Sequence, residues 1–144
     1  MLIVLARRVL IPAAVSTSVI CQTPSVIKWV APDYPPLARY FNCSGHIEVS
    51  LTVKPDGTVE SARAWAYAVE NGQSHLQRLF PASEDAAKKW LFSPTKSTHH
   101  LKLNFAFQLY PPDTPDGRLS AEQITEHSIL IKTKALAVVP RETQ

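Results

Sequence analysis

Two stretches of alternating residues on either side of a tight turn constrain the fold of this chain most strongly. Residues 46–53 alternate between apolar and polar side chains, and residues 59–65 return in the same manner. In the turn, Pro55 pre-sets one backbone dihedral, Asp56 can hydrogen-bond locally and Gly57 accepts a positive φ. Alternation with a period of two is typical of half-buried strands. The sequence therefore predicts an antiparallel hairpin with one face on a core.

The most regular alternation lies further along the chain, in Leu101–Leu109. Five large apolar side chains would share one face of this strand, and burying each contributes about 1.5–3 kcal/mol. A slip of one residue would turn all five to water, so we expect a firmly fixed register. The predicted inner side is Leu101, Leu103, Phe105, Phe107 and Leu109, and the outer side is Lys102, Asn104, Ala106 and Gln108.

Two helices are predicted around these strands. Pro35–Pro36 opens a short helix over Leu37–Phe41, because a proline in the first turn loses no hydrogen bond. Asn42 suits the left-handed stop that follows. A second helix is predicted to begin with Ser83 as its N-cap, with acidic residues in its first turn and Lys88–Lys89 in its last.

Trp90 and Phe92 follow the apolar side of the second helix, which favours a place in the core over a place at a binding surface. In the tail, we predict a short helix over Ser120–Thr125 and a strand over Ser128–Val139. The sequence leaves open whether that strand packs on the domain or hangs free.

The N-terminal segment differs from the rest of the chain. Residues 1–6 are apolar, Arg7–Arg8 are basic, and a mostly apolar stretch follows to Ile20. This order is typical of a bacterial secretory signal peptide. A short membrane anchor and a buried strand are the alternatives, and the stretch is short for a span, which needs about 20 apolar residues. We divide the chain into a signal peptide or short membrane anchor (1–21), a connector (22–33), a domain (34–109) and a C-terminal extension that includes the further strand (110–144).

The two cysteines allow two outcomes. Cys21 and Cys43 could pair in an oxidising compartment. If a leader is removed before Cys21, Cys43 is a lone structural thiol, and their spacing does not decide between these outcomes.

No motif in the sequence indicates a reaction. The histidines and cysteines show no zinc-ligand spacing, and four glycines leave little material for a phosphate-binding loop. His99–His100 could serve a small exported enzyme, but no nucleophile–base pair accompanies them. A net charge of +3 without a basic stripe disfavours nucleic-acid binding. We predict no cofactor, no metal site and no enzymatic activity.

Several short pieces follow one another in a definite order between Tyr34 and Leu109. They are Tyr34-Pro35, Ala38-Arg39, Gly45 before the first strand, Asp56-Gly57 in the turn, Trp90 and Phe92 with Pro94 after the second helix, and the strand Leu101–Leu109. Their order and spacing resemble the C-terminal domain of TonB-family energy transducers.

The resemblance implies a two-layer α+β fold with helices packed on one face of a three-stranded antiparallel sheet. It also implies a periplasmic domain, exported or tethered to the inner membrane, that captures a short peptide of an outer-membrane receptor as an added strand. An inner-membrane motor complex would then drive transport across the outer membrane. Strand exchange between two chains would give a homodimer.

The resemblance places the capturing edge on the last predicted strand. An edge strand leaves unpaired N–H and C=O groups, so an extended peptide can complete the ladder. The predicted peptide-binding residues are Leu101, Lys102, Leu103, Asn104, Phe105, Ala106, Phe107, Gln108 and Leu109.

The connector keeps a second hypothesis open. Residues 22–33 reach about 40 Å when fully extended, which is short for a spacer that crosses the periplasm. A non-transducing envelope scaffold or interaction domain of the same fold is therefore the alternative. Pairing of Ser128–Val139 with the edge Leu101–Leu109 would favour that alternative.

Overall fold

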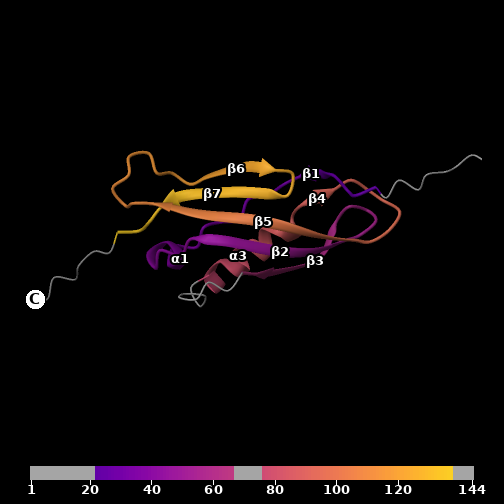
Figure 1. Cartoon of the computed structure of the whole chain (residues 1–144), viewed down its shortest axis with the longest axis horizontal. Helices are drawn as coiled ribbons and strands as arrows, with labels where there is room; N and C mark the ends of the chain where they lie inside the picture. The colour runs from indigo at the N-terminus through magenta and orange to yellow at the C-terminus, as the bar shows by residue number, and fades with distance from the viewer. Residues whose placement is uncertain (1–21, 67–75, 138–144) are drawn as a thin grey trace, which may run out of the picture.

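A five-stranded sheet spans the molecule in the strand order β3-β2-β5-β7-β6, with α1 and α3 on one of its faces (Figure 1). The structure is a computed structural model that describes residues 22–66 and 76–137. The segment 1–21, for which we predict a signal peptide or anchor, and its Cys21 lie outside the described residues. Among the described residues, none of the helices has the length and apolar character needed to cross a bilayer.

The predicted hairpin is confirmed as β2 (Gly45–Val53) and β3 (Val59–Trp65), which pair antiparallel. Gly57 in its turn has a φ of 89°. A Cβ there would lie 1.9 Å from the carbonyl oxygen of Phe92, so only glycine fits this approach. The Asp56 carboxylate accepts hydrogen bonds from the backbone N–H of Thr58 at 3.0 Å and from its hydroxyl at 2.7 Å. The turn therefore forms by the local chemistry that its residues predict.

The first helix is α1 (Pro36–Tyr40), and Asn42 follows it with a φ of 53°, as predicted. The N-cap prediction for the second helix is wrong. After a short 3-10 turn, η1 (Gln77–Leu79), α3 spans Phe80–Lys88. Pro81 fits into its first turn, so the helix starts before Ser83. The buried Ser83 hydroxyl instead donates to the carbonyl oxygen of Leu79 at 2.7 Å.

A second, two-stranded sheet joins the connector to the domain. Its strands are β1 (Val26–Lys28) and β4 (Leu91–Phe92). Trp90 and Phe92 are buried, which confirms that they belong to the core. The Trp90 indole N–H donates to the carbonyl oxygen of Val30 at 2.8 Å, so the residues just before the domain pack against it.

The predicted third strand is β5 (His99–Tyr110), but the sheet does not end there. The tail contributes β6 (Ser120–Thr125) and β7 (Ser128–Lys134), so the α+β class is confirmed and the prediction of three strands is wrong. The predicted helix over residues 120–125 is also wrong. That stretch pairs with β7, so the backbone groups of the two strands form hydrogen bonds with each other. This pairing outweighs the weak local preference of residues 120–125 for a helix.

The core lies between the sheet and the layer of helices. From β5 it takes Leu103, Phe105 and Phe107, which are fully buried, whereas Leu101 and Leu109 at the strand ends are half-buried. Two isoleucines of β7, Ile129 and Ile131, extend the same core beneath the tail. The C-terminal hairpin is therefore packed on the domain rather than hanging free.

Candidate functional site

The predicted capturing strand lies inside the sheet. β5 pairs with β2 on one side, from His99 to Phe107, and with β7 on the other, from Asn104 to Tyr110. The expectation that this strand forms an edge is therefore corrected. The physical reason is that the tail brings its own apolar residues, which need cover, and the flank of β5 offers both backbone partners and a core.

The partner strand β7 runs parallel to β5 and is firmly held. The exposed fractions of its Ile129 and Ile131 are 1 % and 0 %. The Arg39 Nε donates to the carbonyl oxygen of Lys134 at 3.1 Å, and the Ala135 N–H donates to Tyr110 at 2.9 Å. Buried side chains within the strand and hydrogen bonds at its C-terminal end thus keep the tail on β5.

The outer side chains of β5 lie on the open face of the sheet, opposite the helices. Lys102 forms an ion pair with the buried carboxylate of Glu48, with Nζ and Oε1 at 3.0 Å. The same carboxylate accepts the indole N–H of Trp65 at 3.1 Å. Asn104 and Gln108 are exposed on this face. The predicted selecting residues are therefore face residues rather than edge residues.

Hydrogen bonds beyond the regular ladders show which backbone groups of the tail face outward. His127 and Ala135, which flank β7, bond towards β5, and Lys134, the last residue of β7, bonds towards the β6 side through Gly117. Because the direction alternates along a strand, the even-numbered residues of β7 turn to β6. Their partners Ser120 and Glu122 then bond inward. The N–H and C=O groups of Ala121 and Gln123 point away from the sheet.

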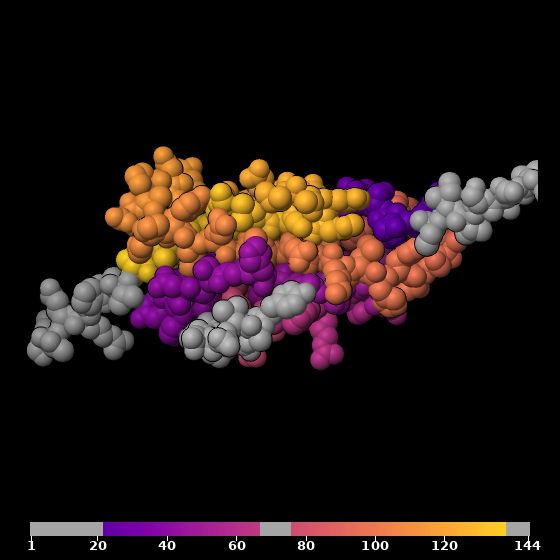
Figure 2. All heavy atoms as spheres, viewed as in Figure 1, coloured from indigo at the N-terminus to yellow at the C-terminus, as the bar shows by residue number. Residues whose placement is uncertain are grey.

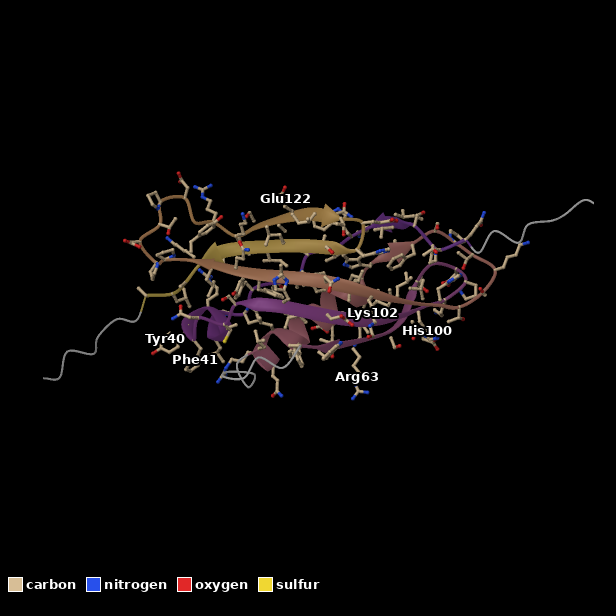
Figure 3. All side chains as sticks on the ribbon, viewed as in Figure 1. Tyr40, Phe41, Arg63, His100, Lys102 and Glu122 are labelled. Carbon is tan, nitrogen blue, oxygen red and sulfur yellow. The ribbon has the colours of Figure 1, made fainter. Side chains whose placement is uncertain are left out.

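Within the described residues, β6 has one strand neighbour and is exposed along its whole length. Figure 2 shows the C-terminal hairpin, in orange and yellow, along one margin of the molecule. Glu122 lies at the same margin in Figure 3. Ile124 is 56 % exposed, at a point where the register with β7 shifts. Its open backbone groups and exposed side chains make β6 the candidate docking edge.

The opposite edge, β3, is treated differently. The N–H of Ala64 points outward and donates to the Glu84 carboxylate of α3 at 2.9 Å. Ala64 itself is buried, because α3 packs against this strand. A helix and its side chain therefore occupy part of this edge.

Residues quoted for the family resemblance mainly shape the core. The Tyr34 hydroxyl donates to the carbonyl oxygen of Cys43, and its ring meets Phe107 edge-on with centroids 5.2 Å apart. Burial raises the pKa of Tyr34 above its ordinary range, and it also raises the pKa of the Cys43 thiol. Of the other quoted residues, Ala38, Gly57, Trp90 and Phe92 are buried, Pro35, Arg39 and Gly45 are half-buried, and Asp56 and Pro94 are exposed.

Sequence reasoning missed β6, although the hairpin left a signal. In a strand, the side chains of residues 129, 131 and 133 would lie on one face and those of residues 130, 132 and 134 on the other. The stretch Thr125–Ser128 before them holds four polar residues that suit a turn. A strand after such a turn needs a partner before it, which is Ser120–Thr125. Across residues 22–66 and 76–137, no group of three or more His, Cys, Asp or Glu side chains is arranged to hold a metal ion.

Comparison with known proteins identifies a family. The family described as Gram-negative bacterial TonB protein C-terminal matches residues 30–109. No curated protein matches the sequence. The matched region ends within β5, so the hairpin of β6 and β7 lies beyond it.

Proposed function

This chain belongs to the family of Gram-negative bacterial TonB C-terminal domains, which are protein-interaction domains, and we propose that it accepts an extended polypeptide as an added strand along β6. The observation that carries this proposal is the outward direction of the backbone groups of Ala121 and Gln123 on an exposed edge. Main-chain hydrogen bonds to these groups would supply affinity. The protein would then act in the cell envelope as an adaptor.

Energy favours β6 over β5 as the docking strand. A peptide that adds to β5 along Asn104–Tyr110 must first remove β7. Exposing Ile129 and Ile131 alone would cost about 1.5–3 kcal/mol each, before any ladder hydrogen bonds are counted. A peptide that adds to β6 removes nothing from the described part of the chain.

The side chains of β6 suggest what the added strand carries. Glu122 lies on the open face, since its register partner Leu130 does, and its carboxylate favours a Lys or Arg on the neighbouring strand. The exposed Ile124 favours an apolar or aromatic neighbour. We therefore expect a ligand segment that is extended and basic, with an apolar residue about two positions from the basic one.

The test uses a displayed library of random short peptides, selected on the full chain. Peptides that are enriched are measured by calorimetry against Ala121→Pro, which removes an outward N–H and leaves the inward ladder intact. The matched control is Ala62→Pro, the same exchange at an outward position of β3. We expect binding to be lost in the first variant and kept in the second. Equal binding by both variants would rule out the β6 edge.

A second candidate function retains the transport role. The hairpin that covers β5 lies outside the matched region 30–109, so a receptor peptide could take the flank of β5 if the hairpin were displaced. That route would suit coupling to an inner-membrane motor complex. Without displacement, the arrangement suits a non-transducing envelope scaffold.

A disulfide lock separates the two functions. Ala106 and Leu130 are register partners, half-buried, on the open face. Oxidising the double variant Ala106→Cys with Leu130→Cys would fasten β7 to β5. Peptide binding that survives oxidation supports docking at β6, and binding that returns only after reduction supports displacement from β5.

The location in the envelope is a part of the proposal with its own test. We propose that residues 1–21 direct the chain to the periplasm, by removal of a leader or as an inner-membrane tether. Fractionation of cells that make the full chain should place it outside the cytoplasm. Deleting residues 2–20 should retain it inside, and export that survives this deletion would contradict the proposal.

A further inference from the structure

Away from both edges, the open face of the sheet is hollowed between β3, β2 and β5. The hollow holds about 280 Å³. Its polar lining is Ser50, Thr52, Ser61, Arg63, His100 and Lys102. Neither the matched family nor the proposed docking edge accounts for this concentration of hydroxyl and cationic groups in one place.

The register of three strands arranges these groups in two rows. Ser50 lies between Arg63 of β3 and Lys102 of β5, and Thr52 lies between Ser61 and His100 in the same way. Adjacent strands lie about 4.8 Å apart, so the backbones of Arg63 and Lys102 lie roughly 10 Å from each other. Short hydroxyl side chains form the floor, and long side chains flank it.

The hollow is rich in hydrogen-bond donors. The residues that line it carry three hydroxyls, a guanidinium and an ammonium, and Thr52 Oγ1 lies 3.3 Å from His100 Nδ1. The Glu48 carboxylate of the same face is already engaged by Lys102 at 3.0 Å and by Trp65 at 3.1 Å.

Arg63 supplies the charge that is free to act. Among the described residues it makes no ion pair. Its side chain extends away from the sheet, whereas His100 and Lys102 come from β5, on the other side of β2 (Figure 3). Its long side chain can turn back over Ser50, and its planar fork matches the oxygens of an oxyanion.

We infer that this hollow binds a phosphate monoester group. A phosphate offers several acceptor oxygens in a tetrahedron, and the lining offers donors from both rows at once. A carboxylate has two oxygens in one plane and would leave part of the row of hydroxyls unused. The phosphate would sit over Ser50 and order Arg63 above it.

The test is a titration of the full chain with inorganic phosphate, followed by amide chemical shifts. We expect saturable shifts confined to residues 50–52, 61–63 and 100–102, with acetate at equal ionic strength giving none. Arg63→Gln should weaken binding roughly tenfold, as loss of a charge-assisted bidentate contact does. The matched control is Lys132→Gln, which removes one positive charge from the same face outside the hollow.

A second variant guards against an indirect effect of the first. Ser50→Asp places a carboxylate on the floor of the hollow at an exposed position, where it should not disturb folding, and should abolish binding. An equal loss in Arg63→Gln and Lys132→Gln would mean unspecific attraction to a positive face, and the proposal would fail. Shifts spread over the whole surface would also overturn it.

The source of the phosphate group is decided by two further arms. One uses glucose 6-phosphate in solution, and the other uses vesicles of phosphatidylcholine with or without phosphatidic acid, whose head group is a phosphate monoester. Binding that depends on Ser50 in the first arm alone assigns a soluble ester. The same dependence in sedimentation with phosphatidic acid vesicles assigns a lipid head group. Failure of both arms would overturn the assignment of a phosphate monoester to the hollow.

Discussion

Both edges of the sheet have outward-pointing backbone groups, but these groups are covered at β3 and exposed at β6. At β3, the outward N–H of Ala64 is bound by the Glu84 carboxylate, and α3 packs over the strand. At β6, Ala121 and Gln123 face solvent, and no residue of the strand is buried. A protein that must avoid unwanted strand pairing covers its edges, so an edge that stays open is a candidate for use. The difference teaches where to look for a partner.

The largest effect should come from the strand beneath the open edge. Ile131→Ala removes a side chain that is 0 % exposed and should cost about 2–5 kcal/mol of unfolding free energy, because it leaves a cavity. The matched control is Ile124→Ala in β6, where the isoleucine is exposed and the loss should be small. Urea unfolding measures both, and similar losses would mean that β6 is more deeply packed than its exposure indicates.

The direction of the backbone groups along β6 predicts the next effect. Glu122→Pro removes an inward hydrogen bond to Leu130 and should destabilise the hairpin by about 1–3 kcal/mol, since it leaves a ladder acceptor unpaired. Ala121→Pro removes only an outward N–H and should leave stability nearly unchanged. Hydrogen exchange of the β7 amides measures the difference. The reverse order of effects would show that the outward residues are the even-numbered ones.

Opening the covered edge should have a smaller effect on stability and a visible effect on association. Glu84→Gln weakens the contact to the N–H of Ala64 and should cost roughly 0.5–1.5 kcal/mol, the usual net value of such a bond. Asp85→Asn, its exposed neighbour on α3, serves as the control. Light scattering should show that the first variant associates more readily than the second. Unchanged association would mean that helix packing alone protects β3.

The smallest effect near neutral pH concerns the core on which both edges depend. Burial raises the pKa of Tyr34 in the folded state, so the unfolded state releases the phenol proton first as the pH rises through about 10. Stability should therefore be complete below that pH and fall above it. Tyr34→Phe should flatten this decline in urea titrations, and the exposed Tyr40→Phe should leave it unchanged. An equally steep decline in both would assign it to other groups.

The candidate site was predictable only in part from the sequence. The alternation in Leu101–Leu109 correctly assigned inner and outer side chains, because the period of a strand is local. The same residues do not indicate how many strands follow. Ser120–Thr125 has a composition that also suits a helix, and only its pairing with β7 makes it a strand. The sequence therefore predicted the docking edge on β5, the strand with the clearest pattern, whereas the structure makes β6, the strand with the weakest pattern, the candidate.

The sequence alone determined the turn at Gly57, the hairpin of β2 and β3, the stop at Asn42 and the family, since each depends on short-range geometry or on residue order. The tertiary structure decided which strand borders solvent, because backbone groups are satisfied by partners that lie far away along the chain. It also brought Ser50, Arg63 and Lys102 into one hollow, through the register of three strands. The alternation of side chains along a strand depends on neighbouring residues, whereas the order of strands in a sheet depends on contacts between distant segments of the chain.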